Sequence, residues 1–158
     1  MVDILSREKR SALMASVRTV GTVPEMRVRK VAHSCGLRYR IAPRGVLGRP
    51  DLSFSRARIA VFVHGCFWHG HKGCRKAKLP STNSEFWKAK IQSNQMRDAE
   101  TQSHLIESGW QHIVIWECET RNYVQIVERL APAIIYYRGS ESLSRALQTD
   151  FPLNLIRK

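Results

Sequence analysis

Apolar side chains recur at helical spacing in four parts of the chain. Pro24 suits the first turn of one predicted helix, and Gly36 suits its C-terminal end. The segment Thr82-Asn83-Ser84-Glu85 predicts a capping box that starts a long amphipathic helix, which Gly109 ends. The predicted helices span residues 8–18, 25–35, a long segment reaching about residue 108, and 123–136.

Short apolar runs between these helices predict β-strands. The most apolar run, Arg58–His64, is typical of a buried central strand, and Trp110–Trp116 has the same character. Shorter strands are predicted over residues 37–41 and 51–54. Helices and strands in this order favour an α/β sandwich around a mixed β-sheet.

The chain is expected to divide into three parts. Residues 24–138 are predicted to form one domain, after a flexible or helical arm, residues 1–23, and before a loosely held tail, residues 139–158. No apolar run approaches the roughly 20 residues that cross a membrane, and the N-terminus lacks the pattern of a secretion signal. We therefore expect a cytoplasmic protein.

Positive charge is concentrated in the middle of the chain. There are 26 lysines and arginines against 13 acidic residues, and the segment 26–84 contains only one acid, Asp51. Such an uneven basic field is typical of proteins that bind nucleic acid. A basic surface kept for solubility is the alternative.

Asp51 is a candidate ligand for a divalent cation. Pairing of two short strands would bring it close to Val63 and His64. A carboxylate in surroundings that attract phosphate is typical of a Mg²⁺ site, and Mg²⁺ prefers oxygen ligands. Such an ion can activate water for hydrolysis. The alternative is that Asp51 caps a turn or pairs with Arg49.

The loop from His64 to Cys74 contains three histidines and two cysteines within 11 residues. Together with a cysteine after the last strand, this loop supplies the ligand types of a tetrahedral structural zinc site. The alternative is a set of reduced cysteines without a metal. The predicted zinc ligands are Cys66, His71, Cys74 and Cys118.

Two histidines of this loop, His64 and His69, are left for other chemistry. Near pH 7 a neutral imidazole accepts a proton from water, and a charged one donates to an oxyanion. The alternative is that one of them replaces His71 in the zinc site.

Large aromatic residues also lie on this polar loop. Neither a strand pattern nor a helix pattern would bury Phe67 and Trp68, and Trp87 follows at the start of the long helix. Adjacent aromatic rings on a basic loop can wedge between base pairs or stack on a base. A small core that covers the metal site is the alternative.

Several unusual sequence blocks occur together in one order, and they resemble the very-short-patch-repair (Vsr) DNA mismatch endonucleases over about residues 8–130. The blocks are Gly48-Arg49-Pro50-Asp51, His64-Gly65-Cys66-Phe67-Trp68-His69, the spaced block Glu85-Phe86-Trp87-x-x-Lys90-Ile91-x-x-Asn94-x-x-Arg97-Asp98, Gly109-Trp110 and Trp116-Glu117-Cys118.

The resemblance implies a restriction endonuclease-like three-layer sandwich that nicks double-stranded DNA 5′ to the mismatched thymine of a T:G pair. It implies that Asp51 and the Val63 main-chain carbonyl bind Mg²⁺, and that His69 is the general base, supported by His64 and Glu25. It assigns a structural Zn²⁺ to the four Cys and His ligands, although the gap between His71 and Cys74 is one residue longer than in the family.

The resemblance also implies DNA contacts by Phe67, Trp68, Trp87, Met14, Lys90 and Asn94. We further expect a monomer that acts at the nucleoid, with mismatch-repair proteins as partners. The competing hypotheses are a zinc-stabilised DNA-binding module without catalysis, and a nuclease of the same fold with restriction-like substrates.

Overall fold

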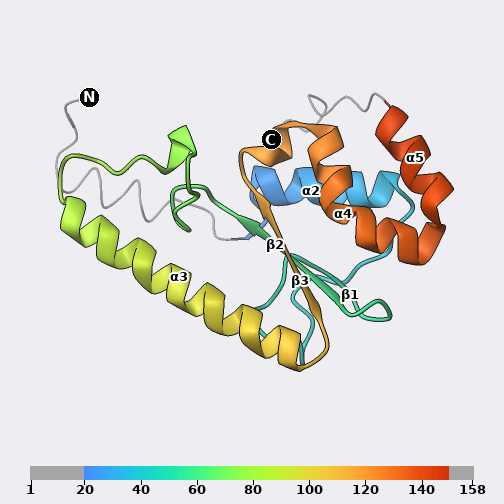
Figure 1. Ribbon diagram of the computed structural model, residues 1–158, viewed down its shortest axis with the longest axis horizontal. Coiled ribbons are helices and arrows are strands. Elements are labelled where there is room, and N and C mark those ends of the chain that lie inside the picture. The colour runs from blue at the N-terminus through green and yellow to red at the C-terminus, as the bar shows by residue number, and fades with distance from the viewer. Residues whose placement is uncertain (1–19, 150–158) are drawn as a thin grey trace.

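A computed structural model of the chain describes residues 20–149 (Figure 1). The predicted helix over residues 8–18 and the predicted DNA contact Met14 lie outside the described residues. No helix of the described part is long and apolar enough to cross a membrane.

A three-stranded sheet occupies the middle of the molecule. It consists of β1 (Leu52–Phe54), β2 (Ile59–His64) and β3 (Gln111–Trp116) in the order β1-β2-β3. β1 is antiparallel to β2, and β3 is parallel to β2. The predicted mixed sheet is therefore confirmed, with the most apolar strand at its centre, where both faces are covered.

The predicted strand over residues 37–41 is wrong. Only Arg40 bridges to Ser53 of β1, and the backbone then turns away at Ala42, which has a φ of 40° and precedes Pro43. Ile41 is 50% exposed, so this run does not have a buried face to hold it against the sheet.

Helices cover both faces of the sheet (Figure 1). On one face lie α2 (Val23–Ser34), α4 (Tyr123–Arg138) and α5 (Ser140–Gln148), and on the other lies α3 (Ser84–Glu107). Two 3₁₀ turns, η1 (Arg75–Ala77) and η2 (Glu119–Arg121), lie in the connections.

The two sides of the sheet differ in polarity. Alternate residues of a strand point to opposite faces, so Val61 and Ile115 join the large apolar core formed with α2 and α4. On the α3 side the apolar core is small and contains Ala60, Phe62 and Leu105. Because this core is small, the other strand positions that face α3 can hold polar and aromatic side chains.

The predicted capping box at residues 82–85 is not formed. The residue before α3 is Asn83, which is left-handed (φ 55°) and makes no capping hydrogen bond with its side chain, because α3 begins later than Thr82 would require. A related arrangement caps α2 instead. There the Thr22 side chain accepts from the Glu25 N–H, and the Thr22 hydroxyl donates to the Glu25 carboxylate.

The segment after Gly139, expected to be a loose tail, begins with the helix α5. Ala146 is buried and Leu143 packs against the main core. This short helix is held by tertiary packing, since nine residues are too few for a stable isolated helix. The boundaries of the three predicted parts of the chain remain predictions.

Candidate active site and metal centre

A pocket of about 220 Å³ opens between the sheet and α3, and it collects the predicted catalytic residues. Its walls come from α2, the loop before β1, β2, the loop after β2, α3 and β3. The lining residues are Glu25, Gly48, Arg49, Asp51, Phe62, Val63, His64, His69, Asp98, Thr101 and His112.

Asp51 lies at the entrance of β1, beside the end of β2. Its Oδ2 accepts a hydrogen bond of 2.7 Å from the Val63 N–H, so the carboxylate and the Val63 main chain are direct neighbours, as the sequence predicts. Burial raises the pKa of Asp51 to about 6, and the nearby Glu25 adds to the rise. The charged carboxylate is therefore unfavourable in the free protein, and a bound cation would stabilise it.

Gly48 holds the loop before Asp51 close to α3. Its φ is 77°, and a Cβ at this position would clash with the Thr101 side chain. Only glycine combines this backbone conformation with this close approach.

The two loop histidines lie together at the side of the pocket. Their rings are stacked, with centroids 3.9 Å apart. His69 Nδ1 lies 2.6 Å from Oδ2 of Asp98 on α3, and His64 Nδ1 lies 3.9 Å from the same oxygen. The contact to Asp98 favours a proton on Nδ1 of His69, which leaves Nε2 to accept a proton from another group.

His64 is the more buried of the two imidazoles. Burial, together with the neighbouring His69, lowers the pKa of His64 to about 4, against the opposing influence of Asp98. His64 is therefore neutral near pH 7.

The ligand atoms of His64, His69 and Asp98 lie within 4.8 Å of one another, so this group could also hold a metal ion.

Glu25 lines the pocket, but its carboxylate also has local partners. It accepts hydrogen bonds from the Gly21 N–H, the Thr22 hydroxyl and Arg29, at 2.8, 2.8 and 3.0 Å. Glu25 is therefore part of the cap of α2 as well as a wall of the pocket.

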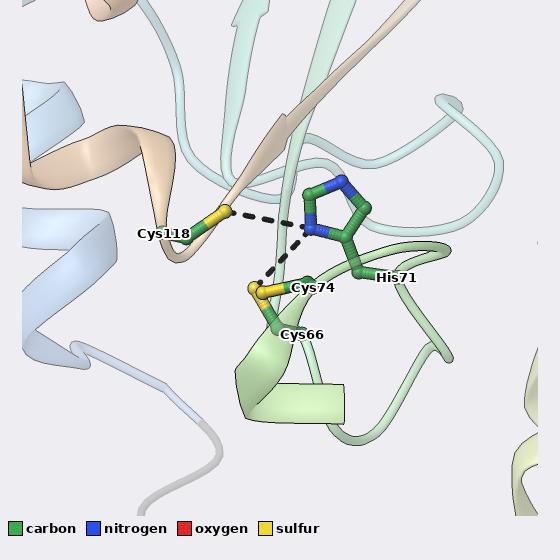
Figure 2. Close-up of side chains that lie close together, drawn as sticks. All are labelled: Cys66, His71, Cys74 and Cys118. Atoms are coloured by element: carbon green, nitrogen blue, oxygen red, sulfur yellow. Dashed lines mark hydrogen bonds between the residues drawn. The ribbon is translucent and has the colours of Figure 1, made fainter. Parts of the chain in front are cut away.

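A second cluster gathers three thiols and one imidazole (Figure 2). His71 Nδ1 lies 3.5 Å from Cys66 Sγ and 3.4 Å from Cys118 Sγ, and all four ligand atoms, with that of Cys74, lie within 4.8 Å of one another. The longer gap before Cys74 does not keep it out of the cluster. These four side chains could hold a metal ion.

The thiols of this cluster differ in acidity. Burial raises the pKa of Cys66 to about 12 and also raises the pKa of Cys118, whereas the Lys76 N–H lowers the pKa of Cys74. The ring of Trp116 stacks on that of His71 at a centroid distance of 4.2 Å, and it meets the ring of His64, in the pocket, edge-on at 5.6 Å. Trp116 thus lies between the cluster and the pocket.

The predicted aromatic residues form a small cluster of their own. The ring centroids of Phe67, Trp68 and Trp87 lie 5.2 to 5.9 Å apart in edge-on contacts, and each residue is half-buried. Phe86, beside Trp87, is 62% exposed. The aromatic cluster therefore has one packed side and one side open to solvent.

The predicted DNA contacts on α3 differ in environment. Asn94 is buried, and its side chain donates to the Trp68 carbonyl at 2.7 Å and accepts from Arg97. It therefore supports the loop that carries the aromatic residues. Lys90 is exposed.

Comparisons with known proteins show which family the sequence belongs to. A family model described as DNA mismatch endonuclease Vsr matches residues 2–76. The DNA mismatch endonuclease Vsr of Escherichia coli is 36% identical over 128 residues, which cover 81% of this chain and 81% of the relative. The chain belongs to the Vsr family.

Other relatives in the Vsr comparison are named as nicking enzymes. The type II nicking enzyme V.XorIIP of Xanthomonas oryzae pv. oryzae is 42% identical over 82% of this chain and 95% of its own length. The type II nicking enzyme V.NmeAIP of Neisseria meningitidis is 41% identical over 82% of this chain and 92% of its own length.

Sequence reasoning missed two members of the site in this Vsr-family chain. Asp98 lies in one of the sequence blocks shared with the family, but the sequence does not indicate its role, because its partner His69 is 29 residues away. His112 also lines the pocket, and its ring packs against Phe62 at 4.9 Å. The alternation along β3, which points His112 toward α3, was the available signal.

Proposed function

We propose that this protein is a Mg²⁺-dependent endonuclease of very short patch repair, which nicks double-stranded DNA 5′ to the mismatched thymine of a T:G pair. The observation that carries the proposal is the pocket in which Asp51, His64, His69 and Asp98 meet beside the end of β2. Membership of the Vsr family supports the same activity.

Asp51 and the Val63 main-chain carbonyl would hold the Mg²⁺. The carboxylate fits this role because it is a hard oxygen ligand, lies against the Val63 main chain, and is largely desolvated, so that its pKa is raised despite the positive charge of nearby Arg29. When bound, Mg²⁺ supplies activation of water and offsets charge on the leaving oxygen.

His69 is the general base of the proposed reaction. Asp98 holds its Nδ1, so its Nε2 accepts the proton of the attacking water, and the adjacent carboxylate stabilises the imidazolium that forms. His64 is neutral and buried, and it supports His69 by stacking on its ring. Glu25 supports the pocket through the cap of α2 and through its effect on Asp51.

The three thiols and His71 would hold a structural Zn²⁺. A tetrahedral zinc with Zn–S bonds of about 2.3 Å separates its ligand atoms by about 3.8 Å, which agrees with the spacing of the cluster. The ion would join the loop after β2 to the end of β3, and so support the histidines that alternate with its ligands.

The aromatic cluster would supply mismatch selectivity. Insertion of Phe67 and Trp68 beside a base pair requires unstacking, and this costs less where pairing is already weak. A T:G wobble pair is therefore distorted more easily than a normal pair, and Trp87 extends the same stacking surface.

A nicking assay tests the proposal. The protein is incubated with Mg²⁺ and with matched and T:G-mismatched duplexes whose flanking bases are randomised, and the nicked strands are sequenced. We expect nicks only on the 5′ side of the mismatched thymine. Binding without nicking would favour a DNA-binding module, and nicking of matched DNA at a defined sequence would favour a restriction-like nuclease.

A further inference from the structure

A second hollow lies on the other side of the loop that carries the Cys and His ligands. One wall is formed by this loop between Gly70 and Leu79, and the other by the early turns of α3. Its volume is about 550 Å³, against about 220 Å³ for the catalytic pocket. The first turns of α3 lie away from the sheet, at one end of the molecule (Figure 1).

Three exposed lysines surround this hollow, and among residues 20–149 no acidic residue lines it. We call it the lysine cleft, after Lys72, Lys78 and Lys88. Lys88 also pairs with Glu85 at 2.8 Å, but both side chains are more than half exposed, so the pair is weak and easily exchanged. The lysine cleft therefore presents a net positive charge to solvent.

The lysine cleft and the catalytic pocket share a thin wall. His69 lines the pocket, and the next residue, Gly70, lines the lysine cleft. A Cβ on Gly70 would lie only 2.6 Å from Nε2 of Gln95 and 2.8 Å from Cγ2 of Ile91, so the loop lies directly on α3 here. Gln95 also donates to the His69 carbonyl at 3.2 Å. One layer of residues separates the two hollows.

A DNA strand has the chemistry to occupy both. Successive phosphates of one strand follow one another every ~3.4 Å along the helix axis, so a strand with one phosphate in the catalytic pocket continues over the adjacent surface. Lysine ammonium groups bind phosphate as point charges and need no fixed geometry. Trp87 of the aromatic cluster directly precedes Lys88 of the hollow on α3, so a strand bound there would pass beside the aromatic cluster.

We propose that the lysine cleft binds backbone phosphates that flank the cleaved bond. This inference rests on the proposed function for the nature of the ligand. It assigns to Lys72, Lys78 and Lys88 a contribution to affinity that does not depend on base sequence or on the mismatch.

The test removes the three lysines together, as Lys72→Gln, Lys78→Gln and Lys88→Gln. Binding to a short matched duplex and to its T:G counterpart is measured without divalent cations over a range of salt concentrations. The logarithm of the binding constant falls as the logarithm of salt concentration rises, and each lost phosphate contact makes this slope shallower by about 0.9. We expect the slope to fall by about 2 to 3, with at least about tenfold weaker binding to both duplexes at moderate salt.

The matched control removes three arginines at the opposite end of the molecule, as Arg56→Gln, Arg138→Gln and Arg145→Gln. These lie in the turn between β1 and β2, at the end of α4 and in α5, far from the first turns of α3 (Figure 1). The control variant should keep the slope close to that of the wild type. An equal fall in both variants, or no fall in the lysine variant, would overturn the proposal.

A single Lys78→Gln variant guards against misfolding of the triple variant, and it should lower the slope by about 1. The two proposals fail differently. If the wild-type protein never nicks DNA but the salt slope still becomes shallower in the lysine variants, the proposed endonuclease activity is wrong. The role of the lysine cleft in binding phosphate would then remain. Normal nicking with an unchanged slope would remove the lysine cleft alone.

Discussion

The proposed catalytic pocket and the Cys/His cluster share the loop after β2, yet the pocket gathers carboxylates and imidazoles whereas the cluster gathers three thiols and one imidazole. His64 and His69 turn toward α3 and Asp98, whereas Cys66 and His71, between and beyond them in sequence, turn toward Cys118. Tight local bonds set this alternation, since the His69 N–H donates to the Gly65 carbonyl at 3.1 Å and the His71 N–H to the Cys66 carbonyl at 2.9 Å.

The two sites are also expected to affect the stability of the fold differently. The pocket keeps a carboxylate whose pKa is raised and an imidazole whose pKa is lowered, so burial opposes the charged form of each group. The cluster closes four soft ligand atoms around one point and can gain binding energy from a metal. We therefore expect substitutions in the pocket to reduce activity, and substitutions in the cluster to reduce stability.

The largest expected effect is on activity, in the variant Asp51→Ala. Loss of the carboxylate removes the proposed Mg²⁺ ligand, so nicking of a T:G duplex should fall by about 1,000-fold or more. DNA binding should remain or improve, since a negative charge beside the phosphate is removed. Single-turnover nicking and equilibrium binding are measured on the same duplex. Nicking near the wild-type rate would show that the proposed active site is wrong.

The next effect is on stability, in the variant Cys118→Ser. Loss of the ligand from the end of β3 should lower the free energy of unfolding by about 3 kcal/mol and reduce the zinc content of the purified protein together. Denaturant unfolding and metal analysis are the measurements. Cys35→Ser is the matched control, because Cys35 lies outside the cluster and should leave the zinc content unchanged.

The same measurements separate the two imidazoles. His71→Ala should lose zinc, and His69→Ala should retain zinc while losing nicking activity. A full equivalent of zinc with unchanged unfolding in Cys118→Ser would remove Cys118 from the ligand set.

A smaller effect of opposite sign is expected for Asp51→Asn in buffer without added Mg²⁺. The pKa of Asp51 is raised from 3.8 to about 6, so the folded state binds the proton more tightly than the unfolded state. Its ionisation therefore destabilises the fold as pH rises from about 4 through 6. The variant should be more stable than the wild type by about 2 kcal/mol at pH 7, after allowance for partial exposure.

This gain should vanish as the pH falls to about 4, where Asp51 is neutral in both states. Denaturant unfolding of both proteins at the two pH values provides the measurement. A gain that is the same at both pH values would assign it to packing of the amide and not to the charge of Asp51.

The smallest effect is expected on mismatch binding, in the double variant Phe67→Ala, Trp68→Ala. Stacking on a base contributes roughly 1–3 kcal/mol, so binding to a T:G duplex should weaken by at least about tenfold. Binding to matched DNA should change less and keep its salt dependence. Both rings are only partly buried in the free protein, so the melting temperature should fall only modestly.

An equal loss of binding to matched and mismatched duplexes, together with a large fall in stability, would mean that the two rings only pack the loop. The aromatic cluster would then contribute to stability, as the Cys/His cluster does, and other residues would have to recognise the mismatch.

Local pattern alone determined much of this protein. The apolar run of β2 and the periodicity of α4 predicted these elements, because burial of a strand or a helix face leaves a signature within a few residues. The identity of the Cys and His residues, and the blocks shared with the Vsr family, led to the candidate residues of both sites before their positions were known.

Tertiary structure decided which local signals were used. The run at residues 37–41 forms only one bridge, since the backbone leaves the sheet at Ala42. Conversely, the polar segment after Gly139 becomes α5, because Leu143 and Ala146 find an apolar surface on which to pack. A short segment takes the structure that its neighbours stabilise, and its own sequence does not identify those neighbours.

The partners of His69, the proposed general base, were also decided by the tertiary structure. His69 and Asp98 are 29 residues apart, and they meet because α3 crosses the polar side of the sheet. The same crossing encloses Asp51 and His64, and this burial displaces their pKa values. Sequence determines which groups are available, but the distance between them and their exposure to water depend on how the helices pack on the sheet.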